Sequence, residues 1–340
     1  MLLKKLCEIN AVSGNEGKVR EHLKQIIAPY VDSIHTDKIG NLIAVKSGAS
    51  EISPTVLLCA HMDEIGLMIT EITTEGYLKF QLVGGMDIRI LVSKQVVISD
   101  KVKGVIGSKA IHLQKKDERK KALDLEKLYI DIGVNTKEEA EKLVRIGDYA
   151  CFDVFYEEFG ANLIKAKAFD DRAGCYLITE ILHNVHDCKI IAAFTVQEEV
   201  GLRGSKVLSN NIQADFAIIL ESTNVMDICE NREDEWVGEL GRGPICSVID
   251  RTTIYNNQLV KHIFNIAKEF DIPLQYRKGA NGGNDAGKVH LACNGIPTIT
   301  LSIPCRNIHS MNSVISKDDL DSCEYLVNKV LEKFSLNKKI

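Results

Sequence analysis

The most constraining feature of the sequence is an apolar run that ends in two carboxylates. Residues 190–197 read Ile-Ile-Ala-Ala-Phe-Thr-Val-Gln, and Glu198 and Glu199 follow them directly. A continuously apolar run of strand length predicts a strand covered on both faces, as in a parallel sheet. Because Gly201 begins a turn into a short helical segment, the pair lies at the carboxyl edge of that strand. Open α/β sheets bind their ligands at this edge.

Three other apolar runs end in the same way. They are residues 55–60 before His61 and Asp63, residues 214–220 before Glu221, and residues 296–303, which lead to His309. An acidic pair, Asp170 and Asp171, stands just before the apolar-periodic segment 175–182. Because the ends of parallel strands meet at one edge of a sheet, we expect these polar groups to converge.

Convergence changes the interpretation of each of these residues. Alone, a His at a strand end is usually a satisfied polar residue, and adjacent Glu residues usually form a solvated face. Five or six charged groups, however, cannot be buried together without a counter-cation. Two imidazoles and several carboxylates form a ligand set that suits zinc, cobalt or manganese. The sequence therefore predicts a metal cluster formed from His61, Asp170, Glu198, Glu199, Glu221 and His309.

Composition limits the class of partner and the compartment. The chain has 340 residues with a formal net charge of −5, which argues against nucleic acid or an anionic membrane as the main partner. None of the ten cysteines stands in a Cys-x-x-Cys pair, so we expect free thiols in a reducing compartment. The sequence shows neither a signal peptide nor a membrane span, and a cytoplasmic location is expected.

The periodic pattern divides the chain into two domains. Residues 1–70 and 161–340 alternate strand and helix, which predicts an α/β fold with an open, mostly parallel sheet and helices on both faces. Residues 71–160 consist of short β-like runs cut by Gly and charged turns, and they predict a small inserted β-rich domain. Because such a domain exposes strand edges that need covering, we expect it to mediate self-association.

Local signals predict several individual elements. Ser13 and Glu16 have the spacing of a capping box for the first helix, and residues 31–45 read as a hairpin. Later helices are expected at 202–208, at 257–269 and from Ser316 onward.

The ordered motifs of the chain resemble those of the tetrahedral (TET) metallo-aminopeptidases, the glutamyl-aminopeptidase group, over nearly the whole length. The matching motifs are Ala-Val-Ser-Gly at 11–14, Ala-His-Met-Asp-Glu-Ile-Gly at 60–66, Val-Ile-Gly-Ser-Lys-Ala-Ile-His at 105–112, Ala-Phe-Asp-Asp-Arg at 168–172, Gln-Glu-Glu-Val-Gly at 197–201, Gly-Gly-Asn-Asp-Ala at 282–286 and Pro-Cys-Arg-Asn-Ile-His-Ser at 304–310. Several of them are weak signals alone, and their order and spacing make the resemblance specific.

The resemblance implies a role for each predicted ligand. Asp170 is similar to the carboxylate that bridges two divalent metal ions, zinc or cobalt. His61 and Glu221 would complete one ion, and Glu199 and His309 the other. Glu198 matches the catalytic general base, and Asp63 matches the carboxylate that holds His61 in the correct tautomer. The sequence departs from the commonest family pattern at Glu221, where many members have Asp, and at Asn284, where many have Thr and which is expected to cap the following helix.

The implied reaction is stepwise removal of N-terminal residues from peptides. Two cations about 3.5–4 Å apart can bridge a water molecule and polarise the scissile carbonyl. Glu198 can then pass a proton from the water to the leaving amine. The resemblance also implies a homo-oligomer, a dodecamer built from dimers.

Three other functions use part of the same pattern. A dinuclear amidohydrolase acting on N-acylated amino acids or peptides would use the same metals but would read a substrate carboxylate through Arg or Lys. A glycoside hydrolase would use two carboxylates without metal. A non-catalytic interaction module would not need the complete ligand set.

Overall fold

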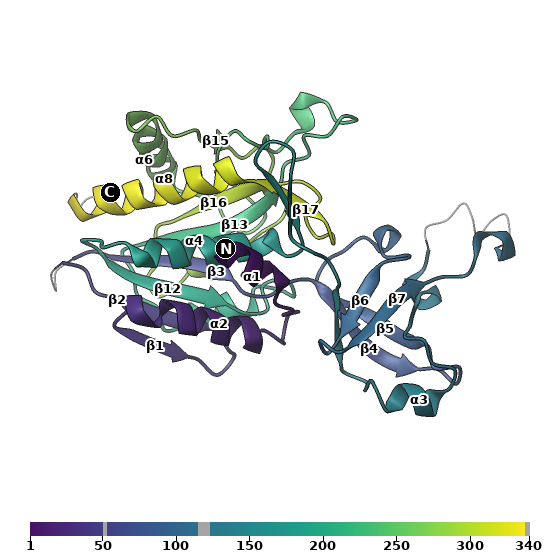
Figure 1. Cartoon of the computed structure of the whole chain (residues 1–340). Helices are drawn as coiled ribbons and strands as arrows, with labels where there is room; N and C mark the ends of the chain where they lie inside the picture. Colours follow the sequence, from purple (N-terminus) through teal and green to yellow (C-terminus); the bar gives the residue numbers. More distant parts are fainter. Residues whose placement is uncertain (50–52, 115–122, 337–340) are drawn as a thin grey trace.

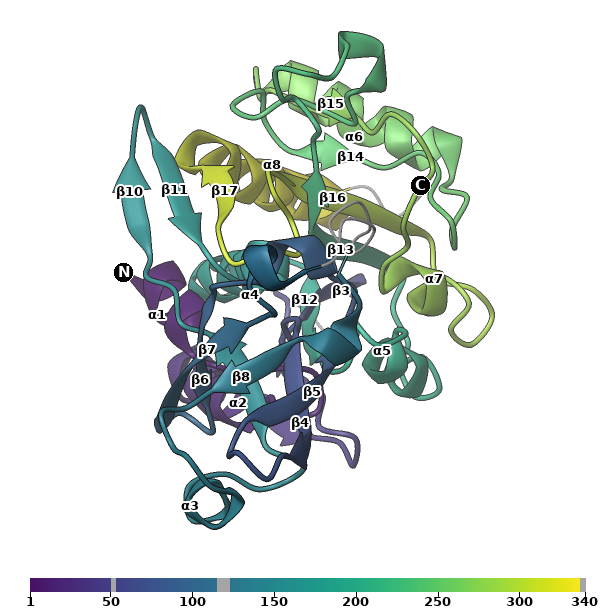
Figure 2. The ribbon, with the colours of Figure 1, turned by 90° about the vertical axis from the view of Figure 1, so that its right-hand side faces the viewer.

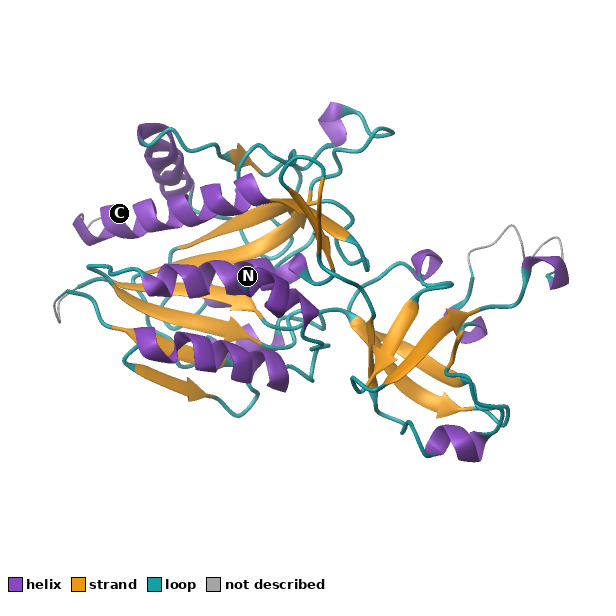
Figure 3. Cartoon of the chain, viewed as in Figure 1, coloured by secondary structure: helices purple, strands orange, loops and turns teal. Residues whose placement is uncertain are grey.

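The chain consists of a large α/β part and a small β-barrel that lies beside it (Figures 1 and 3). The computed structural model describes residues 1–49, 53–114 and 123–336. This arrangement matches the α/β fold with an inserted β-rich domain that the sequence predicts.

The α/β part is built on an eight-stranded sheet. Its strand order is β1 (Ser33–Thr36), β2 (Leu42–Lys46), β12 (Lys189–Thr195), β3 (Thr55–His61), β13 (Phe216–Asn224), β16 (Thr298–Cys305), β14 (Ile245–Cys246) and β15 (Gln275–Tyr276). The four strands β12, β3, β13 and β16 are parallel neighbours. They are the four apolar runs of the sequence, and burial on both faces explains why they lack the exposed polar face of a half-buried strand; even the alternating Thr298, Thr300 and Ser302 of β16 are buried.

Helices cover both faces of this sheet. They are α1 (Leu2–Glu8), α2 (Gly17–Ile27), α4 (Phe169–His183), α5 (Arg203–Leu208), α6 (Asn257–Glu269), α7 (Ala286–Val289) and α8 (Lys317–Leu336). Helix α4 packs on β3 and β13 and contacts α1, α2 and α8. Figure 2 shows α5 and α7 on the opposite side of the sheet from α4. Within the described ranges, no helix combines the length and the apolar character needed to cross a bilayer.

The small domain is a closed barrel with its own core. Its strand order is β4 (Gly66–Ile72), β5 (Leu78–Val83), β8 (Tyr129–Asp131), β7 (Val102–Gly107), β6 (Gln95–Ile98) and β9 (Tyr149–Phe152), and the short helix α3 (Lys137–Glu141) lies at one end. Among the described residues each barrel strand pairs with two neighbours, so none of them is an edge strand of the kind expected from the sequence.

A third, three-stranded sheet packs against the α/β part, where β17 contacts β16, α4 and α8. It contains β10 (Glu157–Phe159), β11 (Leu163–Ala166) and β17 (Ser313–Ser316). The barrel strands thus occupy residues 66–152, whereas the sequence places the insert at 71–160. The strand β11 pairs with β17 from the far end of the chain, a partner that local patterning does not reveal.

The expected capping box at Ser13 and Glu16 is wrong. Helix α2 begins at Gly17 without a side-chain cap. The Ser13 hydroxyl instead donates to Asp63 over 2.6 Å, and Glu16 Oε1 accepts from the backbone N–H of Gln197 over 3.1 Å. Both side chains are buried and are recruited by residues far along the chain, so tertiary contacts override the local motif.

A buried ionic network ties the N-terminal segment to the sheet. Glu64 accepts from Lys167 Nζ over 2.6 and 2.7 Å and from the backbone N–H of Ala11 over 2.8 Å. The Arg172 guanidinium donates to the carbonyl of Met62 over 2.8 Å and lies 3.6 Å from Glu64. Because Glu64 serves two buried cations, its loss leaves both without their counter-charge.

We predict that Glu64→Gln strongly destabilises the protein. The substitution keeps the side-chain volume but leaves Lys167 and Arg172 buried and unpaired, which costs about 3–5 kcal/mol of unfolding free energy. Urea unfolding measures the change. Glu8→Gln is the matched control, because its 4.0 Å pair with Lys4 is exposed and contributes little. Equal stability of the two variants would contradict the importance of the network.

Candidate metal centre

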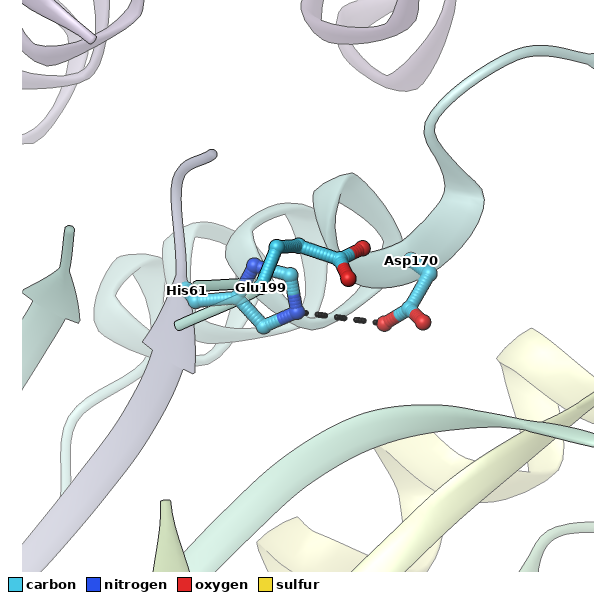
Figure 4. A group of neighbouring side chains, drawn as sticks. All are labelled: His61, Asp170 and Glu199. Carbon is cyan, nitrogen blue, oxygen red and sulfur yellow. Dashed lines mark hydrogen bonds and ion pairs between the residues drawn. The ribbon is translucent and has the colours of Figure 1, made fainter. Parts of the chain in front are cut away.

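The ends of the parallel strands bring the six predicted residues together at one edge of the sheet. His61 is the last residue of β3, Glu198 and Glu199 follow β12, and Glu221 lies in β13. His309 comes from the loop after β16, and Asp170 from the start of α4. Figure 4 shows His61, Glu199 and Asp170 with their polar ends turned toward one another. The convergence expected from the sequence is therefore present in the fold.

Asp170 lies between the two imidazoles. Its Oδ1 is 3.2 Å from His61 Nε2, and its Oδ2 is 3.3 Å from His309 Nε2. His309 Nε2 is also 3.4 Å from Glu199 Oε2, and His61 Nε2 is 3.8 Å from Glu221 Oε2. The donors thus form two groups that share Asp170.

Glu198 is near the cluster but outside its tightest groups. Its Oε2 is 3.9 Å from His61 Nε2. Among the described residues, the sets whose donor atoms all lie within 4.8 Å of one another are His61 with Asp170 and Glu199, and His61 with Asp171 and Glu221. Glu198 belongs to neither set.

A distorted first turn of α4 separates the tasks of the two adjacent aspartates. Asp170 and Asp171 have non-helical backbone angles, and Ala168 before them has φ +58°. Asp170 faces the imidazoles, while Asp171 accepts from the backbone N–H groups of His61 over 3.1 Å and Gly174 over 2.9 Å. Asp171 thereby fixes the main chain that carries His61.

Asp63 organises the site through the main chain. The carboxylate is fully buried and accepts from the N–H groups of Glu198 over 3.0 Å and Glu199 over 3.1 Å. The shortest contact of His61 Nδ1 is with the Asp63 backbone carbonyl, at 3.1 Å, and the Asp63 carboxylate lies at 3.5 Å. An Nδ1–H that donates to this carbonyl leaves Nε2 free to bind a cation.

The pKa values in the cluster indicate a shortage of positive charge. Burial raises the pKa of Glu198 and Glu221 well above the ordinary value and that of Glu199 to about 7. Burial alone lowers the pKa of His309, but the hydrogen bond to Asp170 and the charge of Glu199 outweigh it and raise this pKa to about 9. The raised pKa values show that these groups favour a nearby positive charge, which a proton or a divalent cation can supply. Carboxylate oxygens and imidazole nitrogens are suitable ligands for such a cation.

Several residues of the site have roles that sequence reasoning did not assign. Ser13 and Glu16 support the turn that holds Glu198, as described above. Asp285, which is 1% exposed, accepts from the Thr195 hydroxyl directly beneath the strand ends, while its Oδ1 has no hydrogen-bond partner among the described residues. In the sequence, the one signal for a role of Asp285 is its place in the motif at 282–286.

A cavity of about 710 Å³ opens in front of the cluster. Asp170, Glu198, Glu199, Glu221 and His309 line one part of it, and Arg251 and Arg277 line another. Asp250 also lines the cavity, but it is buried and its carboxylate accepts from Thr252, Thr253 and Tyr255. The cavity therefore combines an acidic, ligand-bearing end with two cationic side chains.

An α/β fold with imidazole and carboxylate donors at the sheet edge points to the class of metal-dependent hydrolases. The M42 glutamyl aminopeptidase family matches residues 40–326, and the chain belongs to this family. It is 40% identical over 331 residues to a putative aminopeptidase of Acetivibrio thermocellus, with 96% of each chain covered. It is 32% identical to the lysyl aminopeptidase of Pyrococcus furiosus, with 98% of this chain and 96% of the relative covered.

Solved structures share the whole architecture. A TET aminopeptidase from a marine sediment Thaumarchaeota archaeon has a TM-score of 0.94 at 33% identity, with 98% and 96% of the chains covered. The TET1 peptidase of Pyrococcus horikoshii has a TM-score of 0.85 at 32% identity, with 97% and 98% covered. A Thermotoga maritima protein named an endoglucanase has a TM-score of 0.82 at 35% identity, with 99% and 98% covered. The protein is a metal-dependent aminopeptidase.

We predict that metal affinity rises with pH. His309, with a pKa of about 9, holds a proton near neutral pH, and Glu199, with a pKa of about 7, holds one part of the time. An incoming ion must displace these protons, so between about pH 6 and pH 8 the affinity should rise about tenfold per pH unit for each proton displaced. Titration calorimetry in buffers of different ionisation enthalpy measures the release. An affinity independent of pH would contradict the assignment, and His309→Gln should flatten the slope.

Proposed function

We propose that the aminopeptidase acts with two divalent ions that share Asp170. His61 and Glu221 would complete the ligand set of one ion, and Glu199 and His309 would complete that of the other. The observation that supports this best is the position of Asp170, whose two oxygens face the two imidazoles at 3.2 and 3.3 Å. Zinc or cobalt suits these imidazole and carboxylate donors.

In this proposal Glu198 is the general base. Bound ions supply the polarisation of the scissile carbonyl and the acidification of a water molecule. Glu198 would take the proton of that water and deliver it to the leaving amine, a role that fits a carboxylate beside the cluster, 3.9 Å from His61 Nε2. Asp63 holds Glu198 in place through its backbone N–H. The surrounding carboxylates also attract a free α-ammonium group, which favours cleavage at an amino terminus.

We predict different outcomes for the two adjacent glutamates. Glu198→Gln should keep the metal content of the parent while kcat falls by about 10² to 10⁴, the usual span for loss of a general base. Glu199→Gln should lose metal as well as rate, because an amide is a poorer ligand. Metal analysis and steady-state kinetics on the same preparations make the comparison. Full activity of Glu198→Gln would falsify the assignment of the base.

We further propose that the enzyme prefers an acidic N-terminal residue. Arg251 and Arg277 line the cavity, and among the described residues neither side chain pairs with a carboxylate. The Arg277 guanidinium donates to the backbone carbonyls of Gly279 and Asn281, which fixes it at the cavity wall. Two unpaired guanidinium groups attract a substrate carboxylate and repel a lysine side chain.

The same pair of arginines is the one feature that favours a second candidate, a dinuclear deacylase that reads the carboxylate of an N-acylated amino acid. The two functions differ in their need for a free amine. Activity on a glutamyl anilide and on its N-acetylated form separates them, because only an aminopeptidase stops cleaving the substrate when its amine is acetylated.

Loss of activity with a chelator would exclude a metal-free glycosidase mechanism.

We predict that neutralising the arginines changes substrate preference rather than chemistry. In Arg251→Gln/Arg277→Gln, kcat/KM for a glutamyl anilide should fall about 10- to 100-fold, the range for a lost charged hydrogen bond, while the glutaminyl anilide is little affected. Lys278→Gln is the control, since this neighbouring exposed cation does not line the cavity. Equal use of the two anilides by the parent enzyme would contradict the proposal.

We propose that the protein assembles with copies of itself. The similar TET1 peptidase of Pyrococcus horikoshii can assemble into a tetrahedron or an octahedral shell. In this chain, Leu143, Ile146 and Phe155 are large apolar side chains exposed on the barrel and the segment after it. Apolar surface of this kind favours association, and a dodecamer built from dimers is the expected form. A monomer in light scattering with metal bound would contradict it.

We also propose a cytoplasmic location. Within the residues that the structure describes, the cysteines form no disulfide, as a reducing compartment requires. A disulfide found in the protein isolated from its own cells would contradict this location.

A further inference from the structure

The loop that carries His309 is closed at its base and strained at its tip. The backbone groups of Arg306 and Val314 exchange hydrogen bonds of 2.9 and 3.0 Å, and Arg306 forms a bidentate pair with Asp227 at 2.7 and 2.8 Å. Between these ends, Asn307 and His309 both have φ +56°. Non-glycine residues keep such angles only when the surroundings hold them.

The tip of this loop is anchored in the barrel. Met311 is 3% exposed and belongs to the hydrophobic cluster that fills the barrel. Every other described member of that cluster comes from residues 67–154. Met311 lies only two positions after His309, so its burial limits how far the imidazole can move.

The segment that follows barrel strand β5 also lies close to the same group of donors. After β5, a Cβ on Gly84 would lie 3.4 Å from Glu199 Cβ, and one on Gly85 would lie 3.9 Å from His309 Nδ1. Gly85 also lines the cavity. His61 and Glu221, in contrast, are parts of the central strands β3 and β13. The barrel therefore contacts the donors of one proposed ion, while the sheet itself carries those of the other.

We propose that Met311 is a positioning residue through which the barrel sets the affinity for one of the two ions. Its side chain, buried in the barrel core, holds His309 beside Asp170 and Glu199. Loss of this anchor frees the loop and weakens the ion at His309, while the ion at His61 and Glu221 keeps its donors. The inference rests on the two-ion site of the proposed function. By thermodynamic linkage, an ion bound at His309 also stabilises the docking of the loop in the barrel.

The test measures Zn²⁺ binding to the full-length protein after chelator treatment. In Met311→Ala, the binding event that His309→Ala abolishes should weaken about 10- to 100-fold, the usual effect of losing a residue that supports a ligand, while the other event is unchanged. Met311→Leu, which refills the space, should restore it. In the His309→Ala background, Met311→Ala should have no further effect on binding.

Ile72→Ala is the matched control. Ile72 is buried in the same barrel core but lies near α3, at the end where the backbone N–H of Lys137 donates to the backbone carbonyl of Thr74. It should keep both binding events, although it also leaves a cavity. If Met311→Ala does not fold, Met311→Val should give a smaller loss of Zn²⁺ affinity. The test is then whether the affinity at His309 falls from the parent to Met311→Val while Met311→Leu stays near the parent.

Two results would overturn the inference. One is parental affinity for both ions in Met311→Ala or Met311→Val, and the other is an equal loss in Ile72→Ala, which would show a general effect of barrel stability. A parent that binds only one ion would instead refute the two-ion site itself, so the two failures are distinguishable.

Discussion

The carboxylate of Asp170 stands between the imidazoles of His61 and His309, and the geometry of the site depends on this arrangement. Each side chain comes from a different element, so no local segment can place any pair of them alone. The parallel pairing of β12, β3, β13 and β16 brings their ends to one edge, where burial, and then the neighbouring carboxylates, raise the pKa of Glu221. Such a cluster must take up either protons or cations.

The carboxylates around the cluster accept hydrogen bonds from backbone N–H groups of the segments that carry the metal-ligand candidates. Asp63 accepts from the N–H groups of Glu198 and Glu199, Asp171 accepts from that of His61, and Glu16 from that of Gln197. These contacts fix the turns on which the functional groups stand. They also make the N-terminal segment a structural support of the site, because Glu16 and the partners of Glu64 and Arg172 lie there. A rigid frame of this kind keeps donors in place when charge changes.

The barrel and the α/β part meet at the loop of His309. Met311 lies in the barrel core, while His309 faces Asp170 and Glu199. The cavity brings together residues from several loops, among them Arg251 and Arg277, whose separation in sequence hides their common location. Under the two proposals, substrate preference depends on the cavity arginines and metal affinity on the barrel, parts of the chain that take no part in the chemical step.

The sequence by itself determined the four buried strands, helix α6 at Asn257–Glu269 and the residues that gather at the strand ends, because apolar runs and helical periodicity are local signals. Only the tertiary structure decided what depends on distant partners. Ser13 and Glu16 turned from a helix cap to Asp63 and Gln197, β11 paired with β17 from the far end of the chain, and Met311 entered the barrel core. In each case burial against a remote segment outweighs the local preference, and a local pattern contains no information about that segment.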